Sequence, residues 1–363
     1  MTPKRYQQIS SQFPKQRIAI VGDFCLDRYL EIDLAKQEIS IETGLPVHNV
    51  MNVRSQPGAS GTILNNLVAL GVGEITPVGF AGDDGEGFEL VRALRQIKGV
   101  DLRAFFQTSD RHTFTYAKPI VVNEGKPPKT TGKSAGGNPL ASQTAAKTSR
   151  GPRELNRLDF KNWTATPADV SKRLIQGLND ISPKMDALIL LDQVDIPGTG
   201  VLTKDVLAAI SKIARKNPQL LILADSRNGL SQFPAVDFKM NGTELSRALG
   251  SHTVPDLSEL HERAGQLAKQ TEHRVFVTLS ECGIIGASPD GLVEHAPALP
   301  VRGEIDIVGA GDSVTANLVT SLLSGASLRE SLEIANAAAS IVIHQLGTTG
   351  TASRKQIKAI LAD

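Results

Sequence analysis

Apolar residues follow two alternating spacings along most of this chain. Short runs rich in Val, Ile and Leu, such as residues 17–24 (RIAIVGDF), precede segments whose apolar residues recur every three or four positions, such as 63–71 (ILNNLVALG). The first pattern is typical of buried strands and the second of helices that bury one face. Further strand-like runs lie at 74–80, 100–106, 187–193, 220–226 and 274–280, and helix-like segments at 88–97, 201–216, 257–270, 312–324 and 328–346. The alternation predicts a doubly wound, mainly parallel α/β sheet with helices on both faces.

Three regions break this rhythm. Residues 29–56 and 113–122 alternate apolar and polar positions as half-buried strands do, and a shorter run follows at 154–160. We expect these strands to form a small β lid, carried by a single domain that spans residues 1–363.

The segment at 123–153 is rich in Gly, Pro, Ser, Thr and Lys and carries six Lys or Arg against one Glu. We expect a flexible basic insertion. It either attracts a phosphorylated or acidic substrate or is a solvated hairpin extension, and we favour the second interpretation. Its TTGKS at 130–134 does not read as a phosphate-binding P-loop, because Pro127 stands where that motif requires glycine.

The overall charge narrows the class of partner. Lys and Arg number 39 against 38 Asp and Glu, so no global field favours nucleic acid or an anionic membrane. No run of about 18 apolar residues or secretory leader pattern is present. Cys25 and Cys282 lie far apart without a Cys-x-x-Cys motif, which favours the reducing cytoplasm. We expect a cytoplasmic protein that acts on small molecules.

The sequence GAGD at 309–312 immediately precedes a helical pattern. Small residues there expose backbone N–H groups at a helix N-terminus, where the helix dipole attracts a phosphate. Asp312 then either presents its carboxylate to a bound ligand or simply caps the helix. The four residues alone leave both interpretations open.

The longer stretch DIVGAGDSVTAN (306–317) resembles the C-terminal signature of the ribokinase-like, PfkB-type carbohydrate kinases. Segments similar to other motifs of that family follow in the same order along most of the chain: IVGDFCLDRYLEID, PGASGTILNNLVALG, VGFAGDDGEG, MNGTE, VTLSECG and ANAAASIVIHQLGTTG. Within the family, GDFCLDRY, RELNRLDF and the C-terminal third look most like the heptose-phosphate kinase part of bifunctional ADP-heptose synthases. We therefore expect the kinase step alone in this chain.

The resemblance implies roles for residues at the phosphates. Asp312 corresponds to the base that accepts the proton of the acceptor hydroxyl, and Gly309, Ala310 and Gly311 correspond to an anion hole for the transferring phosphoryl group. Asn241 and Glu244 match the motif that organises ATP and Mg²⁺, mostly through water. Asp306, together with the GTT at 347–349, matches a site for a monovalent cation such as K⁺.

Other matches concern the nucleotide and the acceptor. The resemblance places the following residues at the nucleotide: Asp225, Thr278, Ser280, Gly283 and Asn336. It places these residues at the acceptor sugar: Asp23, Asp27, Gly58, Ala59, Thr62 and Asp192. For Asn336, a polar contact that lines a helix remains an equal alternative, and for Asp27 an exposed turn is the alternative that we disfavour.

The sequence departs from the family at several of these positions. Most relatives have Gly-Gly, followed three residues later by Asn, where this chain has Gly58-Ala59 and then Thr62. Loss of an amide donor changes which acceptor is bound, since buried hydrogen-bonding groups discriminate strongly between substrates. Ser280 stands where glycine is common, and the pair at 307–308 is Ile-Val rather than polar.

The function implied is ATP-dependent phosphorylation of a hydroxyl on a sugar or sugar phosphate, with a heptose 7-phosphate as the leading acceptor. The resemblance also implies a homodimer. Two alternatives remain: a catalytically silent sugar- or nucleotide-binding protein on the same scaffold, and a nucleoside or vitamin kinase. A dinucleotide oxidoreductase is disfavoured, because GDFCLD follows the first strand in place of Gly-x-Gly-x-x-Gly.

Overall fold

The structure of this protein is a computed structural model that describes residues 1–124, 153–251 and 255–362. Its contacts divide the chain into two compact units. The first comprises Met1–Leu26, Gln56–Phe114 and Phe160–Asp363, and the second comprises Asp27–Ser55 and Thr115–Asp159. Most of the basic segment predicted at 123–153, including TTGKS, lies outside the described residues.

A large, mainly parallel sheet forms the centre of the first unit. Its strands are β1 (Arg17–Gly22), β6 (Glu74–Gly82), β7 (Phe105–Thr108), β11 (Ala187–Asp192), β12 (Leu221–Ser226), β13 (Asp237–Asn241), β14 (Val275–Thr278), β15 (Ile284–Ala287) and β16 (Val293–Ala296). They lie in the order β16-β15-β14-β13-β12-β11-β1-β6-β7. Within the described part of this large sheet, the pairs β14–β15 and β15–β16 are antiparallel, and the other pairs are parallel. The predicted doubly wound sheet is thus confirmed.

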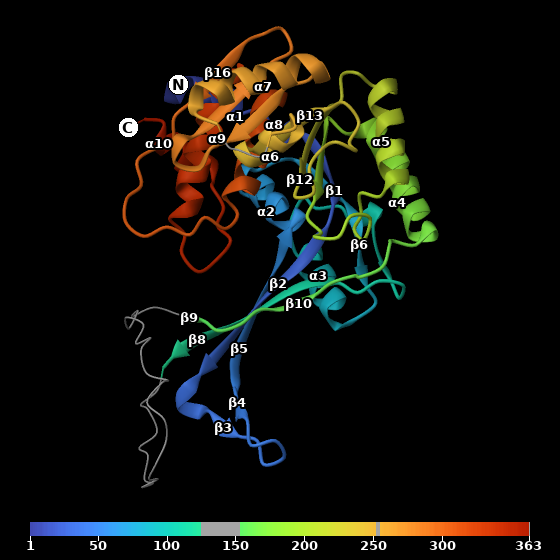
Figure 1. The fold of residues 1–363 in the computed structure, drawn as a ribbon, viewed down its shortest axis with the longest axis vertical. Helices are drawn as coiled ribbons and strands as arrows, with labels where there is room; N and C mark the ends of the chain where they lie inside the picture. The colour runs from blue at the N-terminus through green and yellow to red at the C-terminus, as the bar shows by residue number, and fades with distance from the viewer. Residues whose placement is uncertain (125–152, 252–254, 363) are drawn as a thin grey trace. The chain divides into compact units, whose positions relative to one another are not determined.

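Helices pack on this sheet. They are α1 (Pro3–Ser10), α2 (Ser60–Leu70), α3 (Gly85–Arg95), α4 (Ala168–Ile181), α5 (Lys204–Lys216), α6 (Gly242–Ala248), α7 (Leu257–Thr271), α8 (Ala310–Leu323), α9 (Leu328–Ile343) and α10 (Arg354–Ile360). Helix α8 packs against both α2 and α9, and α4 packs against α5. Figure 1 shows α2, α8 and α9 on one side of the sheet and α4 and α5 on the other.

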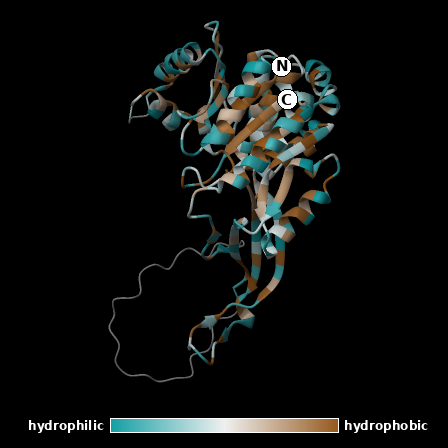
Figure 2. Ribbon diagram, turned by 90° about the vertical axis from the view of Figure 1, so that its right-hand side faces the viewer, coloured by the Kyte–Doolittle hydropathy of each residue, from teal (hydrophilic) through white to brown (hydrophobic). Residues whose placement is uncertain are grey.

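Burial explains why the strands read as continuous apolar runs. In β1 and β11, every side chain from Ile18 to Val21 and from Ala187 to Leu190 is fully buried. Helices cover both faces of such a strand, so alternation with polar residues would place polar groups in the core. Figure 2 shows hydrophobic strands at the centre of this unit, with hydrophilic residues along the outer faces of the helices.

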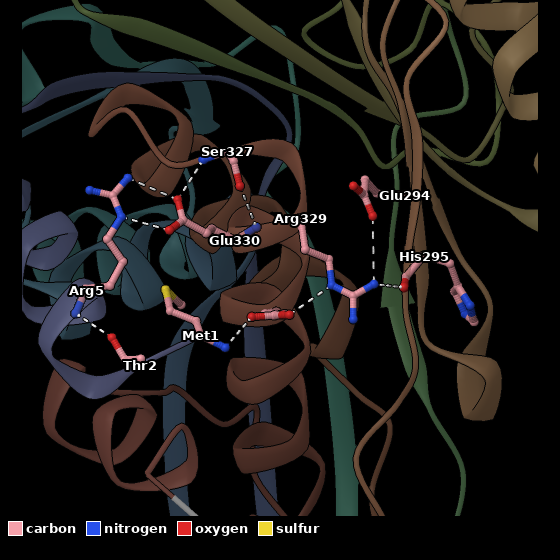
Figure 3. Close-up of polar contacts among 9 residues, drawn as sticks. Met1, Thr2, Arg5, Glu294, His295, Ser327, Arg329 and Glu330 are labelled. Carbon is pink, nitrogen blue, oxygen red and sulfur yellow. Dashed lines mark hydrogen bonds and ion pairs between the residues drawn. The ribbon is translucent and has the colours of Figure 1, made fainter.

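An ion-pair network joins three distant parts of the chain at the start of α9. Arg5 of α1 pairs with Glu330 at 2.7 Å, and Glu330 also forms a capping box with Ser327. Arg329 pairs with Glu333 at 2.8 Å and lies 3.8 Å from Glu294 of β16. Figure 3 shows how these contacts connect α1 and β16 to α9.

The second unit holds most of a smaller sheet. Its strands are β2 (Phe24–Asp33), β5 (Val50–Ala59), β8 (Phe114–Asn123), β9 (Arg153–Glu154) and β10 (Leu158–Phe160), in the order β10-β8-β2-β5, with β9 paired to β8. A short ladder of β3 (Glu38–Ile39) and β4 (Pro46–Val47) lies between β2 and β5 in sequence. These strands fall largely within the ranges where the sequence predicted a small sheet, although β2 already begins at Phe24.

One predicted strand is partly wrong. Residues 100–106 were expected to be extended, but Leu102–Ala104 form a 3-10 turn and β7 begins only at Phe105. The side chain of Asp101 accepts a hydrogen bond from the backbone N–H of Arg103 at 3.0 Å. Local capping of this kind competes with strand pairing and explains the difference.

No helix within the described part of the chain has the length and apolar character needed to cross a membrane.

Candidate active site

The GAGD sequence begins α8 at the carboxyl ends of the parallel strands. Gly309 is the N-cap residue, with a φ of 83° that favours glycine, and no side chain caps this helix. A Cβ added at Gly309 would lie 2.6 Å from Thr349 Cγ2 and 3.4 Å from Thr62 Cγ2. The segments predicted at the acceptor and the cation thus meet at the first residue of the predicted anion hole.

Asp312 is the third residue of α8 and not its cap. The N-cap position itself belongs to Gly309, so Asp312 is not the N-cap residue of this helix. The Asp312 side chain is partly exposed, and its charge acts on the ammonium group of Lys239.

Lys239 is the residue at this site that sequence reasoning missed. Its Nζ lies 2.6 Å from Asp225 Oδ2, and its side chain is only 7% exposed. The same Nζ lies 3.5 Å from the position that a Cβ on Gly311 would occupy, so the ammonium group is directly beside the predicted anion hole. Burial lowers the pKa of Lys239, but the carboxylates of Asp225, Asp312 and Glu244 outweigh it and hold the pKa above its usual value.

A reciprocal capping box organises the start of α6. Asn241 Oδ1 accepts the backbone N–H of Glu244 at 2.9 Å, and Glu244 Oε2 accepts the backbone N–H of Asn241 at 2.7 Å. Burial raises the pKa of Glu244, and the charge of Asp225 adds to that effect. The capping box holds Glu244 through Oε2. The other carboxylate oxygen of Glu244, Oε1, takes no part in the capping box.

These groups fit a magnesium ion that is held mainly by water and ligand phosphates. Among the described residues, no three His, Cys, Asp or Glu side chains form a group that could hold a metal ion. Glu244 and Asn241 offer oxygen ligands, which Mg²⁺ prefers, and Mg²⁺ commonly keeps several of its waters. Glu244 is the residue that would hold such an ion through its waters.

Two aspartates at the ends of β1 and β11 are tied to the protein itself. Asp23 is 2% exposed, and its carboxylate accepts the backbone N–H groups of Gln193 at 2.8 Å and Val201 at 2.7 Å. Asp192 accepts hydrogen bonds from Ser226 Oγ at 2.8 Å and Asn228 Nδ2 at 3.1 Å. Burial, followed by the charge of Asp192, raises the pKa of Asp23 to about 7. In this structure the Asp23 carboxylate holds the segment 193–201, and the Asp192 carboxylate holds the segment 226–228.

The acceptor segment 57–62 contains a strained backbone. Ala59 has φ 53° and ψ −117°, a conformation that glycine adopts readily and other residues rarely do. This is one of the positions where the sequence departs from the Gly-Gly of its relatives. Gly58 is buried and Thr62 is 3% exposed, at the start of α2.

Replacing Ala59 with glycine should stabilise the protein by about 1 kcal/mol, because relief of about 1–3 kcal/mol of strain exceeds the added entropy of the unfolded chain. Urea unfolding measures the difference. Ala69→Gly in the last turn of α2 is the matched control, and it should destabilise by up to about 1 kcal/mol. A loss of stability in both variants would contradict the assignment of strain to Ala59.

The residues predicted at the nucleotide base surround the turn after β14. Ser280 has a φ of 50°, again at a position where relatives commonly have glycine. Gly283 abuts the backbone of Ala296, and Asn336 Nδ2 donates to the carbonyls of Ala296 at 2.8 Å and Pro297 at 3.1 Å. Asn336 on α9 thus makes a polar contact of the kind that the sequence offered as the alternative to nucleotide binding. This contact holds the segment that follows β16.

Thr278 and Asp306 occupy the remaining predicted positions of the first unit. Thr278 Oγ1 donates to the carbonyl of Met240 at 3.4 Å, across neighbouring strands. Asp306 Oδ1 accepts the backbone N–H of Val308 at 3.0 Å, and the Asp306 N–H donates to Ile343 at the end of α9. Asp306 therefore joins the loop before GAGD to α9.

Asp27 is the predicted site residue that belongs to the second unit. It is 7% exposed, so the exposed-turn alternative is excluded. Lys118 Nζ lies 4.0 Å from its carboxylate. Burial raises the pKa of Asp27, while the charges of Lys118 and Arg157 lower it.

Solved structures of other proteins share the fold of this protein. Escherichia coli phosphofructokinase-2, determined in complex with potassium, matches with a TM-score of 0.69 at 18% identity and covers 96% of this chain and 98% of its own. Arabidopsis thaliana ribokinase, complexed with ribose and ATP, matches with a TM-score of 0.63 at 17% identity, over 96% and 99% of the two chains. The protein has a ribokinase-like fold.

Sequence comparison adds a family match and similar curated proteins. Residues 194–355 match the pfkB family carbohydrate kinases. The bifunctional protein HldE of Helicobacter pylori is 28% identical over 350 residues, which cover 95% of this chain and 67% of HldE. The match of residues 194–355 agrees with the resemblance that the motifs carry, and the chain spans about two thirds of the length of the curated relatives that it matches.

Proposed function

We propose that this protein transfers the γ-phosphoryl group of ATP to a hydroxyl of a sugar or sugar phosphate. The observation that carries the proposal is the convergence of Asp312, the buried cation Lys239 and the uncapped glycine-rich start of α8. A base, a cation and backbone N–H groups at one helix N-terminus are the groups that phosphoryl transfer requires.

In the proposed reaction, Asp312 accepts the proton of the acceptor hydroxyl as its oxygen bonds to the γ-phosphorus. The bond from that phosphorus to the bridging oxygen breaks, and ADP leaves with the electron pair. Gly309, Ala310 and Gly311 present backbone groups to the transferring oxygens, and Lys239 adds a positive charge beside them. Because the transition state is loose, position and charge matter more than the basicity of Asp312. Bound Mg²⁺ supplies further charge neutralisation on the phosphates.

The nucleotide is proposed to lie near Thr278, Ser280, Gly283 and Asn336, with Asn241 and Glu244 near its phosphates and metal. Asp306 remains a proposed neighbour of a monovalent cation, a proposal supported by the potassium complex of the similar phosphofructokinase-2. On the acceptor side, Gly58, Ala59 and Thr62 remain proposed contacts, with Asp27 in the second unit.

A heptose 7-phosphate is the proposed acceptor, since the chain resembles the kinase part of ADP-heptose synthases and aligns with HldE over 95% of its length. The cytoplasm is the proposed location, and both cysteines are free thiols, as that compartment favours. Exposed apolar side chains of the second unit, including Ile39, Ile41 and Leu45, support a homodimer, which sedimentation of the purified protein checks.

ATP consumption with a panel of sugars and sugar phosphates tests the function. We expect turnover with at least one phosphorylated sugar and no turnover with nucleosides or vitamins. Binding of ATP and sugars without turnover for every acceptor would support the catalytically silent alternative instead. Turnover of a nucleoside alone would favour the nucleoside kinase.

A further inference from the structure

The turn that follows β14 has a strained backbone. Ser280 has a φ of 50°, and Gly283 has a φ of 93° at a point where a Cβ would collide with the carbonyl of Ala296. Inside the turn, the N–H of Leu279 donates to the carbonyl of Gly283 at 2.8 Å, and the N–H of Cys282 donates to that of Leu279 at 2.9 Å. A residue other than glycine stays at positive φ only where its surroundings hold it there. Contacts from outside the turn are therefore expected to stabilise this conformation.

A histidine on β16 supplies such a contact. His295 Nε2 lies 2.7 Å from the carbonyl oxygen of Cys282, the residue that ends the 3-10 segment of the turn. Because a carbonyl oxygen accepts hydrogen bonds and cannot donate them, Nε2 carries a proton and is the donor. This bond ties the turn at 279–283 to β16.

Two helices hold His295 in turn. Arg329 of α9 donates from Nη1 to the backbone carbonyl of His295, and it also pairs with Glu294 and Glu333. Figure 3 shows Arg329 at this carbonyl, with the imidazole of His295 pointing away from it. On α7, the ring of His261 packs edge-to-face against that imidazole, with ring centroids 5.3 Å apart and planes at 72°. His295 therefore connects α7 and α9 to the turn.

His261 differs from His295 in what it contributes. Its Nε2 is buried and has no hydrogen-bond partner among the described residues. Burial, followed by the charge of His295, lowers the pKa of His261, so this ring stays neutral at neutral pH. His261 thus offers its ring as a packing surface, whereas His295 donates a hydrogen bond.

We propose that His295 is a positioning residue for the nucleotide, whose hydrogen bond to Cys282 holds the turn at 279–283 in the conformation that receives ATP. This inference rests on the proposed function, which puts the nucleotide near Ser280 and Gly283. Without the bond, Ser280 is free to return to a negative φ, and the backbone of the turn leaves its position. Because His295 acts through the turn, its loss affects the binding of the nucleotide and not that of the acceptor.

Calorimetric titration with ADP compares variants without turnover. His295→Phe keeps an aromatic ring but has no donor, and it should raise the Kd for ADP about three- to tenfold, as loss of one hydrogen bond does. His295→Gln retains an N–H donor and should recover most of that loss. His261→Phe keeps the packing surface and should bind ADP as the wild type does. His112→Phe is the control, since it replaces a histidine of the same unit whose side chain is 76% exposed, and it should also match the wild type.

A second substitution tests the strain itself. Added to His295→Phe, Ser280→Gly should tighten ADP binding again, because glycine adopts a φ near 50° readily. In steady-state kinetics, His295→Phe should raise KM for ATP about three- to tenfold and leave kcat and the KM for the acceptor within about twofold of the wild type, the pattern of lost binding to one substrate.

Binding of ADP by His295→Phe at the wild-type Kd would overturn the positioning role and leave the kinase function standing. A Ser280→Gly substitution that fails to tighten binding would overturn it as well, and so would an equal rise of both KM values, which indicates a general structural defect. If the wild type binds ADP but phosphorylates no acceptor, the kinase function fails, and the titration still decides the role of His295. If the wild type binds no ADP, both proposals fail.

Discussion

Replacing Asp312 with asparagine is expected to lower kcat about 10²- to 10⁴-fold for any acceptor that the wild-type protein phosphorylates, the range typical of a lost general base. Asparagine keeps the size of the side chain but cannot accept the hydroxyl proton. Because the substitution leaves the backbone of the anion hole intact, KM for ATP should change only a few-fold. Steady-state kinetics with saturating ATP measure both constants.

The structure offers a matched control for Asp312. Asp205 is an acidic residue in the first turn of α5 and is exposed. Asp205→Asn removes the same charge from the same kind of helix position, where such a charge contributes about 0.3–1 kcal/mol to stability. We expect it to leave kcat unchanged. An Asp312→Asn enzyme with wild-type kcat would show that Asp312 is not the base.

Replacing Lys239 with methionine should lower kcat about 10²- to 10³-fold, as removal of a group that stabilises the transition state does. It should also destabilise the fold by about 3–5 kcal/mol, because Asp225 loses its partner in a buried ion pair. Both effects arise from one substitution, so activity alone cannot separate a catalytic role from a structural one.

A double-mutant cycle with Asp225→Asn separates them. The double variant removes both charges and should recover most of the stability lost in Lys239→Met. Its kcat should nevertheless stay well below that of Asp225→Asn alone, because the positive charge beside Gly311 is still missing. If Lys239→Met and Asp225→Asn together turn over as fast as Asp225→Asn, Lys239 serves only to neutralise Asp225. Thermal unfolding and single-turnover kinetics provide the two readouts.

Lys239 shows why part of the site was invisible in the sequence. In the strand sequence FKMN at 238–241, a lysine between two apolar residues reads as the solvent side of a half-buried strand. The strand instead pairs on both sides within the parallel sheet, and Lys239 is 6% exposed. A buried lysine requires a partner, and Asp225 is supplied by the neighbouring strand β12, an adjacency that no local pattern reveals.

The two positions where this chain lacks the family's glycine were visible in the sequence, but the backbone strain at them was not. Ala59 and Ser280 were noted as side chains where relatives have glycine, and both have positive φ in the structure. For the segment that holds Ala59, the departure from the family indicated a change in which acceptor is bound. The backbone adds a second consequence, strain, because the conformation that glycine adopts without cost is retained at both positions.

The sequence by itself determined the class of fold, through strand and helix periodicities that depend only on local spacing, and the position of the GAGD cradle, since a helix N-terminus is specified by adjacent residues. The tertiary structure decided which side chains lie together within each unit. Asp23 is enclosed by backbone N–H groups of residues 193 and 201, Thr62 contacts the start of α8, and Lys118 lies beside Asp27 across β2 and β8. These neighbours are far apart in the chain, and only the order of strands in the sheet brings them together.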